Sequence, residues 1–119
     1  MSKPNKKAIQ EAEILNSINA AYTAASAATA KYLADCDTVY PCGFAWVMIK
    51  PARGPLVSAL KKNKIGSSGI YGGYMIHNPS RNPTQCMEAK IEGAMAFVKV
   101  IKEAGFATHD TIFIQSRID

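Results

Sequence analysis

The sequence predicts an α/β (or α+β) fold, in which a long N-terminal helix precedes a β-α-β-α-β unit with a small three-stranded sheet. Two observations carry this prediction. Residues 6–36 contain good helix formers with neither Gly nor Pro, and their apolar side chains recur at three- and four-residue steps. The remainder alternates short strand-like segments with two helical segments, divided by turns rich in Gly and Pro.

The length of 119 residues is that of one domain. Within it we expect residues 1–38 to form a helical oligomerisation element and residues 39–119 a small ligand-binding domain. The composition, 48% hydrophobic and 19% charged, is typical of soluble globular proteins. No apolar run approaches the roughly 20 residues of a membrane helix, and no hydrophobic signal core follows the basic N-terminus. We therefore expect a cytoplasmic protein with no membrane partner.

The N-terminal helix is long for so small a protein. At about 1.5 Å per residue it would span roughly 45 Å, and its middle, Ala20 to Ala30, consists mainly of small residues that allow another backbone to approach. A helix longer than its own domain often packs against a second subunit. The sequence therefore predicts a homo-oligomer formed through this helix, and the alternative is a helix folded along the flank of its own domain.

The middle of the chain predicts two strands and a short helix. Phe44 to Ile49 is apolar on both faces, which favours a central strand covered on each side. Pro55 follows Gly54 at a favoured first helical position, and this helix should end near Asn63. Residues 66–69 are expected to form a loop and residues 70–77 a second strand. The Gly72-Gly73 pair in that strand indicates a bulge or a close approach to the backbone.

The third helix and the last strand complete the prediction. Asn82 is a suitable N-cap, with Pro83 at the first helical position, and the helix should run to about Ala104 and stop at Gly105. Residues 111–118 alternate as a half-buried strand does. Strands joined through helices favour parallel crossovers or a small mixed sheet, and the exposed edges of a small sheet also favour oligomerisation.

The net charge of +5 is concentrated in one part of the sequence. Residues 38–87 contain six basic residues and no acidic one, whereas the remainder holds eight basic and nine acidic residues. Such a sector attracts anions such as phosphate, nucleotides or nucleic acid. The alternative is a solvated lysine-rich surface with no partner.

Catalytic and metal-binding patterns are weak. Cys42, His77, Cys86 and His109 are suitable metal ligands by type, but they lack the short spacings of zinc sites. Cys42, His77 and Asp110 could form a nucleophilic set, but no nucleophile motif surrounds Cys42. The three cysteines include no CxxC pair, which is typical of free thiols in a reducing compartment. We expect no metal and no cofactor, and favour a protein that is not an enzyme.

The best-supported site is one for a phosphate-bearing ligand. The start of the third helix offers free amide groups beside Ser80 and Arg81. Tyr71 and Tyr74 could stack on a base, with close approach allowed by the glycines between them. The predicted ligand-binding residues are Tyr71, Gly72, Gly73, Tyr74, Asn78, Ser80, Arg81, Gln85 and Arg117. Weak binding of nucleic acid through phosphates is the competing possibility, although no helix-turn-helix, zinc finger or RNP-type motif is present.

Several short segments resemble a family of small uncharacterised proteins encoded by bacteriophages, over roughly residues 40–119. The segments are Pro41-Cys42-Gly43-Phe44-Ala45-Trp46-Val47, Tyr71-Gly72-Gly73, Asn78-Pro79-Ser80, Gln85-Cys86-Met87-Glu88-Ala89-Lys90, Gly93-Ala94-Met95-Ala96-Phe97 and Ser116-Arg117-Ile118-Asp119. The resemblance implies a phage origin and expression in an infected bacterium, and it assigns no catalytic residue.

Our leading hypothesis from the sequence is a non-enzymatic binding protein that captures a phosphate-bearing small molecule such as a nucleotide. The analogy is with phage proteins that sequester the signalling nucleotides of bacterial immunity in pockets at oligomer interfaces. The alternatives are a protein-binding inhibitor of a host factor, a nucleic-acid-binding accessory protein, and a small enzyme.

Overall fold

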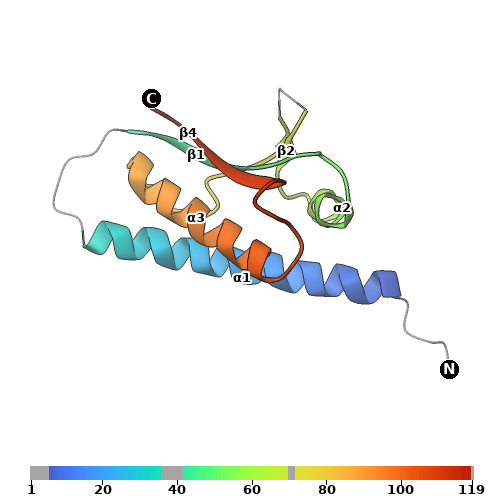
Figure 1. The fold of residues 1–119 in the computed structure, drawn as a ribbon. Coiled ribbons are helices and arrows are strands. Elements are labelled where there is room, and N and C mark those ends of the chain that lie inside the picture. Colours follow the sequence, from blue (N-terminus) through green and yellow to red (C-terminus); the bar gives the residue numbers. More distant parts are fainter. Residues whose placement is uncertain (1–5, 36–41, 70–71, 119) are drawn as a thin grey trace.

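The four strands of the described residues form one sheet that lies on two antiparallel helices. The computed structural model describes residues 6–35, 42–69 and 72–118. Its elements are α1 (Lys6–Ala34), β1 (Gly43–Ile49), α2 (Pro55–Lys62), β2 (Ser67–Ser68), β3 (Tyr74–His77), α3 (Met87–Glu103) and β4 (Ile112–Ile118). In Figure 1 the sheet lies above α1 and α3, and α2 closes one end. The predicted class is confirmed as α+β.

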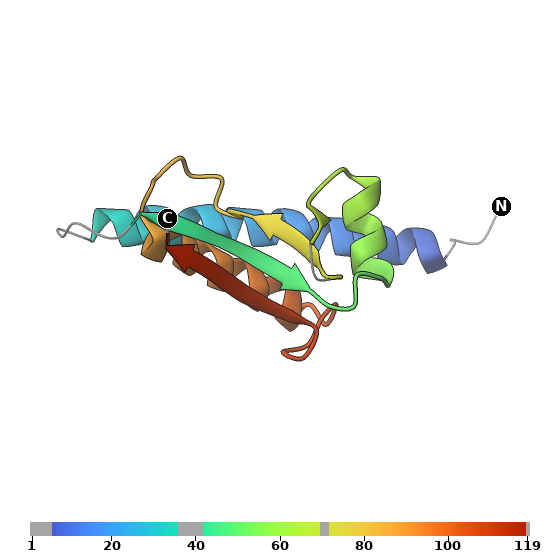
Figure 2. The same ribbon diagram turned by 90° about the horizontal axis from the view of Figure 1, so that it is seen from above.

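The sheet has the order β2-β3-β1-β4, and every neighbouring pair is antiparallel. β3 and β4 flank β1 and so run in the same direction, joined through α3 beneath the sheet, as the view from above shows (Figure 2). The prediction of three strands was therefore incomplete, because the two-residue β2 is too short to leave a periodic pattern. The expectation of parallel crossovers or a mixed sheet was wrong, because β1 lies between the two strands that α3 connects and pairs with both of them in the antiparallel sense.

Helix α1 packs along α3 inside the same chain. The ring centroids of Tyr22 and Phe97 lie 5.1 Å apart, edge to face. Further along α1, the Thr29 hydroxyl donates a hydrogen bond to the carbonyl oxygen of Ala89 in α3 at 2.6 Å. The apolar stripe of α1 is thus buried against its own domain, the arrangement that we weighed as the alternative. Oligomerisation through α1 stays a prediction.

One hydrophobic core joins α1 to the rest of the chain. The inward side chains of the sheet meet residues from all three helices. Its fully buried members include Ile14, Ile18, Val47, Val57, Leu60, Phe97, Ile101 and Ile112. Because these side chains come from α1, α2, α3, β1 and β4, the sheet and the long helix are held by shared packing. None of the helices in the described residues is long and apolar enough to cross a membrane.

The central strand β1 is covered on one face only, and the expectation of cover on both faces was wrong. Both long helices pack under the same side, where Val47 and Ile49 are buried. On the other side no helix of the described residues packs: Phe44 is 44% exposed and Trp46 is partly exposed, whereas Met48 near the end of the strand is buried beside Gly73. An apolar run on both faces does not require two covering layers, because large aromatic side chains also occur on open faces.

Helix α3 begins at Met87, four residues later than the predicted Pro83 start. The Asn82 side chain accepts a hydrogen bond from the Thr84 amide in a turn and does not cap the helix. The Gly43 amide donates to the Gln85 carbonyl at 3.1 Å, and Cys86 forms an isolated antiparallel bridge with Cys42. Pairing with the start of β1 therefore keeps this segment extended, and tertiary contact overrides the local helix-start signal.

The second predicted strand is shorter than expected. β3 covers Tyr74–His77, and Gly73 lies outside it, where its carbonyl accepts a hydrogen bond from the Gly69 amide at 2.6 Å. Gly72 has φ +83, a left-handed conformation that glycine adopts without strain. The glycine pair thus belongs to the connection between β2 and β3.

Candidate functional site: the open face of the sheet

The face of the sheet turned away from α1 and α3 is hollowed. We call it the open face. The hollow measures about 710 Å³ and is lined by Phe44, Trp46, Met48, Ser67, Ser68, Met75, His77, Gln115 and Arg117. These residues come from four strands. Alternation along β1, β3 and β4 places their lining side chains on one side, and Ser67 joins that side opposite Met75, whereas Ser68, opposite Tyr74, lines the hollow from the edge of the sheet. This volume is within the range of small-molecule binding sites.

Trp46 is fixed at the centre of the open face. Its indole Nε1 donates a hydrogen bond to Oε1 of Gln115 at 2.9 Å. Its ring centroid lies 5.8 Å from that of His77, with the planes tilted by 40°. The three residues are opposite one another in the strand register. A partly exposed, fixed indole offers a flat surface on which an aromatic ring can stack without ordering the side chain first.

A second aromatic residue, Phe44, lies beside two cations at one end of the open face. Phe44 is paired with Arg117 across β1 and β4. The Lys90 ammonium lies 5.3 Å from the Phe44 ring centroid and donates a hydrogen bond to the Gly43 carbonyl at 2.8 Å. Lys90 is only 7% exposed, so its charge is held in place. This end of the face therefore combines an exposed ring with positive charge.

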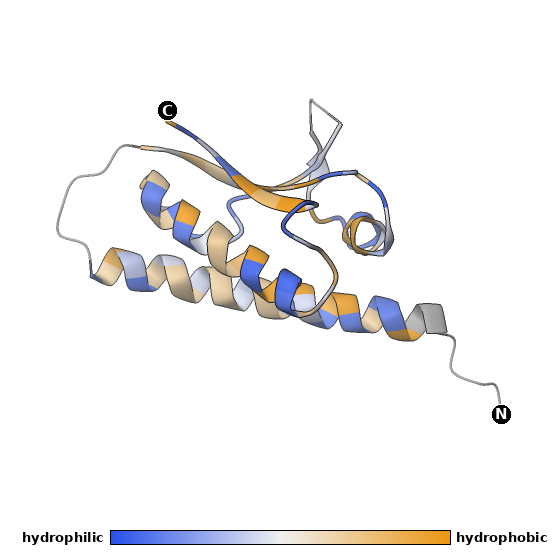
Figure 3. Ribbon diagram, viewed as in Figure 1, coloured by the Kyte–Doolittle hydropathy of each residue, from blue (hydrophilic) through white to orange (hydrophobic). Residues whose placement is uncertain are grey.

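The open face carries no negative charge among its described lining residues. Its charged group is Arg117, and His77 adds an imidazole. Figure 3 shows that β4 changes from hydrophobic at its start to hydrophilic toward the C-terminus, where Gln115 and Arg117 contribute to the face. A lining that combines aromatic and methionine side chains with neutral polar groups and an arginine, and that has no carboxylate among the described residues, is suited to an organic anion.

Tyr74, one of the predicted stacking residues, is part of the core. It is 3% exposed, and its hydroxyl donates a hydrogen bond to the Ile65 carbonyl. Burial, and secondarily the coulombic effect of Tyr22, raises the pKa of Tyr74 above its ordinary value of 10.0. Its ring is therefore not available to a ligand. The other predicted stacking residue, Tyr71, lies outside the described residues.

Gly72 and Gly73 behave differently from each other. Gly72 is exposed, and open space surrounds the position where its Cβ would be. Gly73 is buried, and a Cβ there would collide with the Met48 sulfur. The close approach that we predicted at Gly73 is thus made by Met48, a residue of the open face, and not by an external ligand.

The segment from Asn78 to Gln85, which we predicted as a loop that leads into the third helix, is closed by its own hydrogen bonds. Ser80 is 3% exposed, and its hydroxyl donates to Oδ1 of Asn78 at 2.8 Å, while the side-chain Nδ2 of Asn78 donates to the Asn82 carbonyl at 2.9 Å. The Gln85 side chain is exposed, and its carbonyl is paired with the start of β1. The polar side chains of Asn78 and Ser80 therefore hydrogen-bond within the loop and stabilise its conformation.

The two predicted arginines do not form one site. The Arg81 guanidinium lies over the Tyr22 ring of α1, 3.8 Å from the centroid. Arg117 lines the open face from β4. Of the predicted site residues that the structure describes, Arg117 is the one that lines the hollow.

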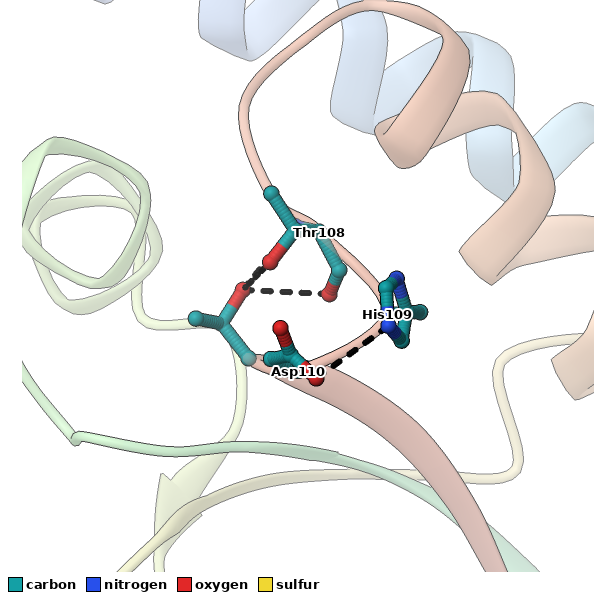
Figure 4. Close-up of polar contacts among 4 residues, drawn as sticks. Thr108, His109 and Asp110 are labelled. Atoms are coloured by element: carbon teal, nitrogen blue, oxygen red, sulfur yellow. Dashed lines mark hydrogen bonds and ion pairs between the residues drawn. The ribbon is translucent and has the colours of Figure 1, made fainter.

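The possible nucleophilic set is separated along the sheet. Cys42 precedes the start of β1, and Asp110 precedes the start of β4, which pairs with β1 in the opposite direction. Cys42 and Asp110 therefore lie at opposite ends of the β1–β4 pair, which are about 20 Å apart because each strand has seven residues. Asp110 instead contacts the neighbouring His109 at 3.2 Å in an exposed turn that Thr108 closes (Figure 4). The described residues contain no group of three potential metal-ligating side chains.

The predicted basic sector does not lie on a single face. Lys62 of α2 forms an exposed ion pair with Glu11 of α1 at 3.0 Å, and Lys61 lies 5.9 Å from the Tyr74 ring centroid. These lysines belong to the end of α2, away from the lining of the open face. Concentration of charge in the sequence therefore did not locate the site.

Sequence reasoning missed most of the open face: Phe44, Trp46, Met48, Ser67, Ser68, Met75, His77 and Gln115. One signal pointed to it, the polar side of the alternating last strand. Gln115 and Arg117 occupy that side, and strand pairing extends the same face to the aromatic residues of β1. The register that makes this connection is tertiary information.

Comparisons with known proteins identify no relative: protein families, curated proteins and solved structures were each searched, and none matches the chain.

Proposed function

We propose that this protein is a non-enzymatic binding protein that captures a nucleotide on the open face of its sheet. The observation that carries the proposal is the fixed indole of Trp46 beside Arg117 in a hollow whose described lining has no carboxylate. The sequence hypothesis of a phosphate-bearing ligand is kept, and its site is moved from residues 71–85 to the open face.

Each part of a nucleotide has a suitable group on this face. A base can stack on Trp46 or Phe44, a contact worth about 1–3 kcal/mol per base. Arg117 can contact phosphate oxygens in a bidentate manner. Ser67 and Ser68, both exposed, add hydroxyl groups at the β2 side of the hollow. A role in sequestering signalling nucleotides of host immunity, in a phage-infected bacterium, remains part of the proposal by analogy.

A second candidate is a short single-stranded nucleic acid. Phe44 and Trp46 are two residues apart on one strand and face the same side, with a spacing of about 6.7 Å. Two stacking surfaces in sequence can bind consecutive bases, as aromatic side chains on other open sheets do. The net charge of +5 is compatible with phosphate contacts along such a strand.

The protein contains one tryptophan, so its fluorescence reports directly on the open face. The test is a titration with linear and cyclic mononucleotides, dinucleotides, inorganic phosphate and a length series of single-stranded oligonucleotides, followed by Trp46 fluorescence and calorimetry. We expect nucleotides to quench the fluorescence and inorganic phosphate to bind far more weakly, because it cannot stack. Affinity that rises steadily with oligonucleotide length would favour the second candidate.

Variants separate this site from general electrostatic attraction. We expect Arg117→Gln to weaken binding about tenfold or more, because a charge-assisted hydrogen bond is lost. Trp46→Leu, read by calorimetry, should weaken it by a similar factor. Arg53→Gln is the matched control, since Arg53 is exposed and does not line this hollow. Equal losses in Arg117→Gln and Arg53→Gln, or no binding of any nucleotide at millimolar concentration, would reject the proposal.

A further inference from the structure

Cys42 and Cys86 are directly opposite each other in an isolated antiparallel β-bridge. The Gly43 amide, one residue after Cys42, donates to the Gln85 carbonyl, one residue before Cys86, at 3.1 Å. A bond between these flanking residues identifies the cysteines as a non-hydrogen-bonded pair. In such a pair the Cα atoms are about 4.5 Å apart and the side chains are on the same face. Disulfides need Cα separations of about 4.4–6.8 Å, so the backbone spacing suits one.

The two backbone segments are held together by contacts that do not involve the thiols. The Lys90 ammonium of α3 donates to the Gly43 carbonyl at 2.8 Å. Gly43 packs so tightly that a Cβ there would lie 2.6 Å from the Arg117 carbonyl oxygen and 2.8 Å from the Met87 sulfur. The cysteines are therefore brought into register by the fold itself, which raises their effective concentration toward each other.

Both thiols are free, and reagents can reach them. Cys42 is exposed and Cys86 is partly exposed. Side chains alternate along a strand, so Cys42 projects to the same side as Phe44 and Trp46, at the end of the open face. Paired, accessible thiols in register are unlike the inert cysteines of a protein core.

We propose that Cys42 and Cys86 are a redox modification site that forms a reversible intramolecular disulfide. The oxidant is a small-molecule disulfide such as oxidised glutathione. One cysteine thiolate attacks it, which forms a mixed disulfide and releases one glutathione thiolate. The second cysteine thiolate then attacks the protein sulfur and releases the second glutathione. Two protein thiols lose two protons and two electrons, and two molecules of reduced glutathione are formed.

The disulfide would covalently join the start of β1 to the residue that precedes α3. It closes a long loop that contains β1, α2, β2 and β3, so oxidation should raise Tm by about 10 °C. It would also fix the end of the open face that carries Phe44. This inference goes beyond the proposed function, and its chemistry does not depend on any nucleotide.

The test is a redox titration of the purified full-length protein in glutathione buffers, with acid quenching, alkylation of remaining thiols and mass spectrometry. Trypsin leaves Cys36 and Cys42 on one peptide, residues 32–53, and Cys86 on another, residues 82–90. Cys36 lies outside the described residues. The Cys36→Ser variant therefore makes the crosslink unambiguous, and Cys42→Ser and Cys86→Ser are the matched controls.

We expect oxidised Cys36→Ser protein to lose both alkylatable thiols, to yield the peptide pair 32–53 and 82–90 joined through sulfur, and to recover on reduction. The Cys42→Ser and Cys86→Ser variants should form no such pair and should show no rise in Tm. Circular dichroism verifies that each variant is folded, and Ala variants at the same positions replace any that is not. Retention of both thiols in Cys36→Ser under strongly oxidising glutathione, or a wild-type crosslink through Cys36, would overturn the proposal.

Discussion

Trp46 on β1 and Gln115 on β4 are opposite each other in the strand register, and the indole Nε1 donates a hydrogen bond of 2.9 Å to the amide Oε1. The contact crosses two strands that are far apart in sequence. It orients the single indole of the protein within the open face, so the aromatic surface exists before a ligand arrives. Such preorganisation lowers the entropy cost of binding.

Replacing the acceptor should release the indole. Gln115→Leu keeps a similar volume but removes the hydrogen bond, so we expect lower fluorescence anisotropy of Trp46 and weaker nucleotide binding. The free energy of unfolding should change by no more than about 0.5 kcal/mol, because Gln115 is exposed. The control is Gln10→Leu at an exposed position of α1, and unchanged Trp46 anisotropy in Gln115→Leu would contradict the prediction.

The buried hydrogen bond between α1 and α3 should contribute measurably to stability. Thr29→Val removes the hydroxyl that donates to the Ala89 carbonyl, which keeps its bond within α3, so we expect a loss of about 1 kcal/mol in denaturant unfolding. Thr23→Val is the control, because the Thr23 hydroxyl bonds the Asn19 carbonyl on the exposed side of the same helix. Equal effects of the two substitutions would show that this interhelical bond contributes nothing of its own.

Gly93 is a point of close approach between α3 and α1. A Cβ there would collide with the Thr29 hydroxyl and lie 2.9 Å from Cβ of Ser80. Gly→Ala in a helix interior normally stabilises by about 1 kcal/mol, but here we expect Gly93→Ala to destabilise by about 1–3 kcal/mol. Chemical denaturation of Gly93→Ala, Thr29→Ala and the double variant measures the coupling. A stabilised Gly93→Ala protein would show that the helices can separate without cost.

Stability should fall at high pH because of Tyr74. Burial raises the pKa of this phenol in the folded state, so the neutral form is favoured there. Above pH 10 the unfolded chain releases the phenolic proton first, and the free energy of unfolding decreases until the folded pKa is passed. We expect this decrease in wild-type protein and a shallower one in Tyr74→Phe, which also loses its bond to Ile65. The measurement is the free energy of urea unfolding as a function of pH. The same slope above pH 10 in wild-type protein and in Tyr74→Phe would exclude Tyr74 as the cause.

Local patterns predicted the elements that have a strong periodicity of apolar residues or clear start and stop residues. α1, α2 and β4 lie close to their predicted bounds, because Pro, Gly and the spacing of apolar residues act over a few residues. The start of α3 was misplaced by the signal at Asn82. The pairing of Gln85 and Cys86 with β1 decided it, and no local pattern encodes that pairing.

The sequence by itself determined that a long helix and a mixed α+β unit would form, and that the chain would be basic in its middle. Only the tertiary structure decided which face of the sheet is covered. Two helices pack under one side of β1, so Tyr74 enters the core while Phe44 and Trp46 remain on the open face. The tertiary structure also decided that Arg117, and not Arg81, lies beside those rings. Strand register brings Phe44 of β1 opposite Arg117 of β4, and no local sequence pattern reports a contact between residues so far apart in the chain.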